Sequence, residues 1–241
     1  MVFVALWQGI EPPKHTAKIR IVCIITIPNG IFYYVKVENR GKFVHYLYIY
    51  RNMEIGSEHK NDVKRAIRKE VRCRIRRLSA DVKALAAEEI YRLVERTEAF
   101  ARAHSIAFYA AMDDEVPTSS ALLRWPAMGK HVVVPRVEGD VMRFYDYAPE
   151  RMQTGAFGIA EPVGDSEYPA GAIDLIIVPA RAFTLDGVRL GRGGGFYDKY
   201  MSLPEFRAYK IGVAFGCQIF EELVCDDHDI LVDEVIASTI A

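Results

Sequence analysis

The sequence has few cysteines, and their spacing excludes two kinds of site. The four are Cys23, Cys73, Cys217 and Cys225, and none forms a Cys-x-x-Cys pair. Such pairs are typical of structural zinc sites, and a dense set of cysteines is typical of small secreted domains held by disulfides. The cysteine pattern favours neither and predicts a protein of a reducing, cytoplasmic compartment.

Long hydrophobic runs are also missing. The longest apolar stretch, residues 21–28, is interrupted by Thr26 and is too short to span a bilayer. The apolar N-terminus has no basic segment before it and no small-residue cleavage site after it, so we expect no signal peptide. The sequence therefore predicts no membrane partner.

The chain has no excess of charge of either sign. Lys and Arg together number 31, Asp and Glu number 32, and the net charge is −1. No global charge draws the chain to nucleic acid or anionic lipid, so we expect no nucleic-acid partner. With 51% hydrophobic and 26% charged residues, the composition is that of a globular protein and excludes a disordered one.

Charge is nevertheless distributed unevenly along the chain. Residues 1–52 hold seven Lys and Arg against two Glu, a balance of +5, which leaves −6 for the remainder. This first segment is rich in aromatic and β-branched residues, and Pro28-Asn29-Gly30 and Asn39-Arg40-Gly41 resemble turns. It therefore predicts three short strands, at residues 19–27, 31–37 and 42–50.

Two interpretations of this basic, aromatic segment are open. Aromatic rings and cations on strands can bind single-stranded nucleic acid. We favour a small β-like appendage, or a segment that is not part of the natural protein, and our hypothesis is that Met53 is the natural initiator. The predicted organisation is a β-like N-terminal extension, residues 1–52, and a single α/β domain, residues 53–241.

The second part begins with two helical patterns. Ile67, Val71, Ile75 and Leu78 form one apolar stripe. Ser79 is a candidate N-cap for a second helix that we expect to run to about Ala103. The residues expected to face inward from that helix are Val82, Leu85, Ile90 and Leu93.

Strand-like and helical runs then alternate. The strand-like runs are residues 106–111, 131–137, 142–147, 175–179 and 211–215, and helical stretches include 119–125 and 197–203. This order predicts a three-layer α/β fold with a largely parallel sheet and helices on both faces. Ligands of such sheets bind outside the carboxyl ends of the strands.

The most informative segment is residues 190–200, Leu-Gly-Arg-Gly-Gly-Gly-Phe-Tyr-Asp-Lys-Tyr. Glycines let backbone N–H groups approach an anion, the following helix directs its N-terminus to the same place, and Arg192 adds a forked donor. It is not a P-loop, because no Gly-Lys-Ser/Thr closes it, and Phe196 breaks a Gly-x-Gly-x-x-Gly pattern. As a bare pattern, a glycine cluster is equally typical of a flexible loop.

The full string resembles the signature of the 5-formyltetrahydrofolate cyclo-ligase family, also called methenyltetrahydrofolate synthetases. Other segments resemble the family's motifs in the family's order: residues 64–68 with Leu78-Ser79, 112–118, 133–136, 154–162 and 228–234. The resemblance covers residues 60–238, and the stretch before residue 53 has no counterpart in the family.

The resemblance implies an enzyme of one-carbon metabolism. The implied reaction is the ATP- and Mg²⁺-dependent cyclisation of 5-formyltetrahydrofolate to 5,10-methenyltetrahydrofolate, with release of ADP and phosphate, through a phosphorylated formyl intermediate. Phosphoryl transfer asks a protein chiefly for positioning and charge neutralisation. The implied partners are a reduced folate and ATP, and we expect a monomer.

Roles for individual residues follow from the same resemblance. Arg192 and Lys64 are the expected catalytic residues. The expected ATP-binding residues are Lys64, Arg68, Leu190, Gly191, Arg192, Gly193, Gly194, Gly195, Phe196, Tyr197 and Asp198. The expected folate-binding residues are Ala110, Met112, Glu115, Phe157, Gly193, Gly194, Gly195, Phe196 and Tyr197. The expected Mg²⁺ ligands are Asp198 and Asp229.

Residue chemistry agrees with these roles but leaves alternatives. Lys64 and Arg68 lie one helical turn apart beside the apolar stripe and can face inward. The alternative is a solvated basic face, which we expect for Arg65, Lys69, Arg74 and Arg77. Glu115 can accept hydrogen bonds from pterin N–H groups, although a solvated turn is the alternative for its acidic run. Carboxylates such as Asp198 and Asp229 are ligands that Mg²⁺ prefers.

Two other functions remain open from the sequence. One is a non-catalytic folate- or nucleotide-binding protein of the same fold. The other is a sugar-phosphate or coenzyme A enzyme, which would also use a glycine-rich anion loop but would not need ATP.

Overall fold

The structure is a computed structural model that describes residues 18–27, 30–39, 42–49, 57–155, 158, 160–164 and 166–240. The chain forms two compact units, residues 1–54 and 55–241. Each unit is described by itself.

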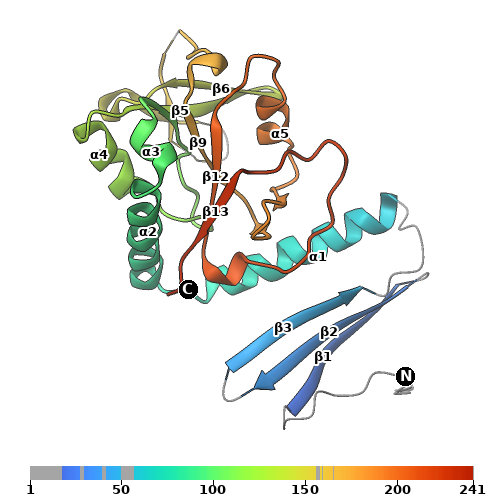
Figure 1. Cartoon of the computed structure of the whole chain (residues 1–241). Helices are drawn as coiled ribbons and strands as arrows, with labels where there is room; N and C mark the ends of the chain where they lie inside the picture. The colour runs from blue at the N-terminus through green and yellow to red at the C-terminus, as the bar shows by residue number, and fades with distance from the viewer. Residues whose placement is uncertain are drawn as a thin grey trace. The chain divides into compact units, whose positions relative to one another are not determined.

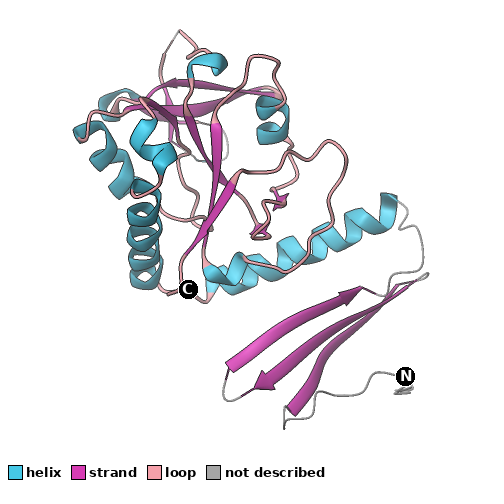
Figure 2. Ribbon diagram, viewed as in Figure 1, coloured by secondary structure: helices cyan, strands magenta, loops and turns pink. Residues whose placement is uncertain are grey.

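The first unit contains a three-stranded antiparallel sheet in the order β1-β2-β3 (Figures 1 and 2). The strands are β1 (Lys18–Ile27), β2 (Gly30–Asn39) and β3 (Lys42–Ile49). The three strands predicted in this segment are therefore present, with bounds that differ from the prediction by one or two residues.

The second unit is built on a six-stranded sheet in the order β13-β12-β9-β4-β5-β6. Its strands are β4 (Ser105–Ala107), β5 (His131–Glu138), β6 (Val141–Asp146), β9 (Leu175–Pro179), β12 (Tyr209–Ala214) and β13 (Glu234–Ala237). All neighbours are parallel except β5 and β6, which form an antiparallel hairpin. The predicted largely parallel sheet is confirmed, although β13 was not among the predicted strands.

Helices cover both faces of this sheet (Figure 1). They are α1 (Ser57–Arg76), α2 (Ala80–Glu95), α3 (Glu98–Arg102), α4 (Ser119–Ala127) and α5 (Phe196–Met201). On one face, Ile176 and Val178 of β9 belong to a buried cluster with Tyr200 of α5. Near α2 and α4, Trp125 stacks on Phe108 with ring centroids 4.5 Å apart. The three-layer prediction is confirmed.

The expected single helix from residue 79 to about residue 103 is in fact two helices. Ser79 caps α2 as predicted, because its hydroxyl accepts a hydrogen bond from Val82 N–H at 3.2 Å. The helix ends at Glu95, because Thr97 takes an extended conformation and caps α3 by accepting from Phe100 N–H at 3.1 Å.

The inward face predicted for α2 is partly wrong. Leu85 and Leu93 are 60% and 37% exposed. Small residues and a tyrosine replace them in the core, and the buried positions are Ala86, Ala87, Ile90, Tyr91 and Val94. Apolar periodicity located the helix but placed its buried face one position away, since alanine carries little weight in such a pattern.

The second unit also contains a loop after β4 and two small strand pairs. The strand expected at residues 106–111 ends at Ala107, and residues 108–118 form a loop with turns after it. Two small antiparallel pairs follow: β7 (Met152–Thr154) with β8 (Ala160–Pro162), and β10 (Ala182–Phe183) with β11 (Arg189–Leu190). Over the described part of the chain, no helix has the length and apolar character needed to cross a membrane.

Candidate active site

A cavity of about 560 Å³ lies at the carboxyl ends of the central strands. Tyr109 and Ala110, which follow β4, and Pro179, which ends β9, form part of its wall. The glycine-rich loop after β11 forms another part. This is the edge at which ligands bind in largely parallel sheets.

The cavity brings together nearly all the residues predicted for the site. Its wall includes Lys64, Arg68, Ala110, Met112, Glu115, Leu190, Gly191, Arg192, Gly193, Gly194, Gly195, Phe196, Tyr197, Asp198 and Asp229. Phe157, the remaining predicted folate contact, lies outside the described residues. The structure therefore places these side chains together, while their individual roles stay predictions.

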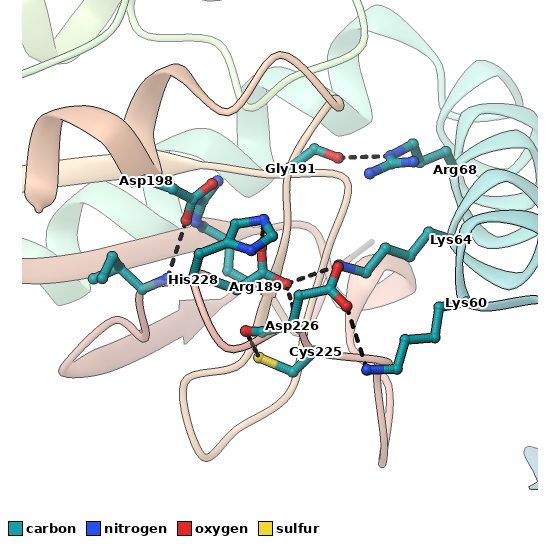
Figure 3. A network of polar contacts seen from close by, with 11 residues as sticks. Lys60, Lys64, Arg68, Arg189, Gly191, Asp198, Cys225, Asp226 and His228 are labelled. Carbon is teal, nitrogen blue, oxygen red and sulfur yellow. Dashed lines mark hydrogen bonds and ion pairs between the residues drawn. The ribbon is translucent and has the colours of Figure 1, made fainter. Parts of the chain in front are cut away.

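Lys64 is a buried cation in the wall of the cavity (Figure 3). Its ammonium nitrogen donates to Asp226 Oδ2 at 2.7 Å and to Asp229 Oδ2 at 2.8 Å. Burial alone would lower the pKa of Lys64, but these two hydrogen bonds and the charges of both carboxylates together raise it above its ordinary value. The inward orientation predicted for Lys64 is confirmed, and the amine is charged at neutral pH.

Arg68 joins the same helix to the glycine-rich loop (Figure 3). Its Nε donates to the carbonyl oxygen of Gly191 at 2.9 Å. Gly193 has φ of +108°, and a Cβ there would lie 3.7 Å from the Arg68 guanidinium carbon. That distance is an ordinary van der Waals contact, so it is the positive φ that favours glycine at this position.

The loop leads directly into α5. Gly195, with φ of +68°, is the N-cap of that helix. A Cβ on Gly194 would lie 2.8 Å from a ring carbon of Phe196, so any side chain there would displace the ring. Glycines suit an anion-binding loop, because they add no side chain between a ligand and the backbone N–H groups.

Arg192 points across the cavity wall to the turn after β4. Its Nε donates to Glu115 Oε1 at 2.8 Å, and its Nη2 is paired with Asp114. Glu115 is buried, and its second oxygen accepts from Met112 N–H at 2.9 Å. The predicted phosphate-binding arginine and the predicted folate-binding carboxylate therefore bind each other in this structure.

The two predicted metal ligands are both held by neighbouring groups. Asp198 Oδ1 accepts from Arg189 Nη2 at 2.5 Å and from Ile230 N–H at 3.1 Å. Asp229 Oδ2 accepts from Lys64 and from Asp226 N–H, the latter at 2.8 Å. Burial would raise the pKa of Asp229, but the hydrogen bonds from Lys64 and from Asp226 N–H, together with the charge of Lys64, lower that pKa below its ordinary value.

Asp198 and Asp229 fit Mg²⁺ only if other groups, such as phosphate and water, supply the remaining ligands. Among the described residues, no group of three or more His, Cys, Asp or Glu gathers as a metal site. Asp198 Oδ2 accepts no hydrogen bond from the described part of the chain, so one of its oxygens is available. Since Mg²⁺ takes one or two carboxylates and completes its shell with phosphate and water, the pair fits a nucleotide-bound ion.

Sequence reasoning missed several residues of the wall, among them Arg189, Asp226 and Glu161. Arg189 is buried and orients Asp198, and Asp226 shares Lys64 with Asp229. Glu161 is buried on β8 and lies within residues 154–162, a segment that resembles a family motif but for which no role of Glu161 was predicted. The neighbouring acidic run at residues 226–229 was a signal for Asp226, whereas nothing local indicated that Arg189 turns inward.

One expectation about a neighbouring residue is corrected. Arg74 is not on a solvated face: its Nη1 donates to Cys217 O at 3.2 Å, and its guanidinium lies over the Phe220 ring. Asp233 has a structural contact, because its Oδ2 accepts from Lys210 N–H at 2.8 Å near the start of β12.

Comparisons with known proteins agree with the motif order. The model of the 5-formyltetrahydrofolate cyclo-ligase family matches residues 60–238. The 5-formyltetrahydrofolate cyclo-ligase of Mus musculus is 30% identical over 190 residues, which are 73% of this chain and 94% of that protein. The Escherichia coli K12 protein of the same name is 32% identical over 144 residues, 56% and 78% of the two chains.

A solved structure agrees as well. The 5,10-methenyltetrahydrofolate synthetase of Aquifex aeolicus superposes with a TM-score of 0.65 and 32% identity. The superposition covers 73% of this chain and 89% of that one.

Proposed function

Because this chain belongs to the 5-formyltetrahydrofolate cyclo-ligase family, we propose that it converts 5-formyltetrahydrofolate and ATP into 5,10-methenyltetrahydrofolate, ADP and phosphate. The observation that carries the proposal is a single cavity that joins phosphate-binding and folate-binding candidates. Lys64, Arg68 and the glycine-rich loop line it together with Glu115 and Met112.

The proposed chemistry solves a leaving-group problem. The formyl oxygen of a formamide leaves poorly, so the γ-phosphoryl group of ATP is first transferred to it. ADP is released, and an iminium phosphate remains. The N10 lone pair then attacks the formyl carbon, N10 loses its proton, and the carbon–oxygen bond breaks with departure of inorganic phosphate. No protein nucleophile is needed, and the enzyme supplies positioning and charge.

Lys64 and Arg68 are proposed to bind the phosphates. An ammonium group has three N–H donors, and Lys64 uses two for Asp226 and Asp229, which leaves one for a phosphate oxygen. Arg68 uses its Nε for Gly191 O. Its other nitrogens remain for the nucleotide, and the positive-φ glycines present backbone N–H groups to the same oxygens.

Glu115 is proposed to bind the folate ring. Its carboxylate is fixed by Met112 N–H on one oxygen, while Arg192 occupies the other. A pterin N–H donor would take the place of the Arg192 Nε or share the oxygen with it. Arg192 would then be free to contact the transferred phosphoryl group with a planar, forked donor set.

Mg²⁺ is proposed to enter with ATP, with Asp198 and Asp229 as its protein ligands. The ion would neutralise charge on the β- and γ-phosphate oxygens. Arg189 and Lys64 hold these carboxylates in place before the nucleotide arrives.

An absorbance assay tests the proposal directly, because methenyltetrahydrofolate absorbs in the near ultraviolet and 5-formyltetrahydrofolate does not. Purified protein mixed with 5-formyltetrahydrofolate and Mg-ATP is expected to generate that absorbance, and omission of ATP is expected to abolish it. Binding of both ligands without any absorbance change would instead support a non-catalytic binding protein, and the proposed reaction would be wrong.

A further inference from the structure

Asp114 is a partly buried carboxylate on which three arginines converge. Its Oδ1 is paired with Arg192 Nη2, and its Oδ2 lies 2.5 Å from Arg181 Nη1. Arg72 Nε lies 3.9 Å from the same Oδ2. Burial would raise the pKa of Asp114, but the ion pairs with Arg181 and Arg192 together outweigh burial and lower that pKa below its ordinary value. This carboxylate is therefore charged throughout the physiological pH range.

The turn that carries Asp114 is tied down on both sides. Glu115 N–H bonds to Met112 O at 3.0 Å, and Ala111 N–H bonds to the Thr118 hydroxyl at 3.2 Å. Further along, the hydroxyl of Tyr109 donates to Val116 O at 2.8 Å. A turn held by such contacts places its side chains within a small range of positions, which a positioning group requires.

Arg181 fixes the other side of Asp114. Its side chain is only 3% exposed. Its backbone N–H donates to Leu190 O at 2.8 Å, immediately before the glycine-rich loop. Asp114 thus bridges one buried arginine at the base of the loop and one arginine within it. Removing the charge of Asp114 would leave Arg181 as a buried cation without its acidic partner.

Glu115 and Asp114, the two acids that bind Arg192, differ in whether they line the cavity. Glu115 lines the cavity, whereas Asp114 is not part of its wall. If folate N–H groups take Glu115 Oε1, the Nε contact of Arg192 is lost or shared. Among the described residues, Asp114 is then the remaining acid within ion-pairing distance of the Arg192 guanidinium.

We propose that Asp114 is a positioning residue that holds Arg192 beside the glycine-rich loop by Nη2 while the Arg192–Glu115 contact is exchanged for substrate. This inference rests on the proposed function and assigns a role to a residue that touches neither substrate. When the folate binds Glu115, Arg192 Nε loses its contact with Glu115. The ion pair with Asp114 then keeps the Arg192 guanidinium in the site.

The chain offers a matched control on the same turn. Asp113 is exposed, and its contact with Lys83 is made by its backbone oxygen rather than by its carboxylate. Asp114→Asn and Asp113→Asn therefore make the same chemical change at adjacent positions. We expect Asp114→Asn to lower kcat about tenfold to a hundredfold, the size of one charge-assisted contact, and Asp113→Asn to change it less than twofold.

A double-mutant cycle separates positioning from a general loss of structure. If Asp114 acts through Arg192, adding Arg192→Gln to Asp114→Asn is expected to lower kcat less than a further threefold, although Arg192→Gln alone lowers it more than tenfold. Asp114→Glu, which keeps the charge, is expected to recover most of the activity. Independent, multiplicative losses, or no recovery by Asp114→Glu, would overturn the assignment.

If Asp114→Asn fails to fold because Arg181 is left unpaired, the cycle is run with Arg181→Gln present in every variant. Arg181→Gln removes the buried charge, so the coupling between Asp114→Asn and Arg192→Gln can still be measured. The same expectations then apply, and the same multiplicative losses would overturn the proposal.

A second measurement does not depend on turnover. Rotation of the Arg192 guanidinium is followed by nitrogen-15 NMR of its two Nη groups, with the signal assigned by its loss in Arg192→Lys. In the wild-type protein and in Asp113→Asn, we expect rotation at least tenfold slower than for the exposed Arg77. In Asp114→Asn, we expect rotation as fast as that of Arg77. If the rotation rates are as expected but the protein does not cyclise 5-formyltetrahydrofolate, only the proposed function is contradicted. If the protein cyclises it but the rotation rates differ from these expectations, only the role of Asp114 is contradicted.

Discussion

Replacing Lys64 with methionine removes a buried cation of the site while nearly preserving the volume of the side chain. Lys64 is 7% exposed and binds two carboxylates at 2.7 and 2.8 Å. The matched control is Lys60→Met. Lys60 lies one helical turn earlier and contacts the same Asp226, but at 3.4 Å with a side chain that is 36% exposed.

The magnitude follows from what each substitution leaves behind. Breaking a buried ion pair costs about 3–5 kcal/mol of stability. Water reaches Asp226, whose side chain is 28% exposed, so we expect the low end of that range, about 3 kcal/mol, for Lys64→Met. For Lys60→Met we expect about 0–1 kcal/mol, the usual value of an exposed pair.

Activity separates the two variants further. If Lys64 donates its third N–H to a phosphate oxygen, its loss removes a charge-assisted contact worth about 1.5–3 kcal/mol, or roughly tenfold to a hundredfold in kcat/KM for ATP. Lys60 does not line the cavity, and Lys60→Met is expected to stay within about twofold of wild type.

The assays are thermal unfolding and steady-state kinetics with varied Mg-ATP. At about 2–4 °C per kcal/mol for a chain of this length, we expect Lys64→Met to lower Tm by about 6–12 °C and Lys60→Met by less than about 4 °C. If both variants showed the same Tm and the same kcat/KM for ATP, Lys64 would be no more than a surface lysine, and the reasoning would be refuted.

Three further predictions concern the loop and the first unit. Gly194→Val is expected to abolish turnover, because its Cβ would lie 2.8 Å from the Phe196 ring, and to lower Tm only slightly, because the loop is exposed. Full turnover of this variant would disprove the phosphate-binding loop. Arg192→Lys is expected to recover less than a tenth of wild-type kcat, because lysine lacks the planar fork that meets Asp114 and Glu115 together, and equal rates would contradict a role for that fork. A chain that begins at Met53 is expected to cyclise 5-formyltetrahydrofolate at the full-length rate, since every predicted site residue follows Met53, and an inactive protein would show that residues 1–52 contribute to the fold or the site.

Local patterns in the sequence located most of the elements that build the site. Lys64 and Arg68 were expected to face inward because they lie beside an apolar stripe, and both line the cavity. The glycine-rich loop was recognised from its order of residues, and the positive φ values of Gly193 and Gly195 show why glycine stands at those two positions. These features depend on spacing along a few residues, which a sequence displays directly.

Contacts between distant segments were not accessible in the same way. Arg192 binds Asp114 and Glu115 across 78 and 77 residues, and no local pattern indicates such a pairing. The same holds for Arg189, which turns inward to Asp198 although it flanks a two-residue strand. The prediction of the inward face of α2 was partly wrong for a different reason, because Ala86 and Ala87 pack in the core where the pattern favoured leucines.

The fate of the formyl oxygen tests the central claim most directly. The measurement uses 5-formyltetrahydrofolate labelled with oxygen-18 in the formyl group, Mg-ATP and the full chain, and it follows the released phosphate by phosphorus NMR. Because the proposed reaction breaks the carbon–oxygen bond after phosphoryl transfer, every molecule of phosphate is expected to carry one labelled oxygen. Phosphate without label, formed alongside methenyltetrahydrofolate, would contradict the phosphorylated formyl intermediate and the arrangement of the site that is proposed to produce it.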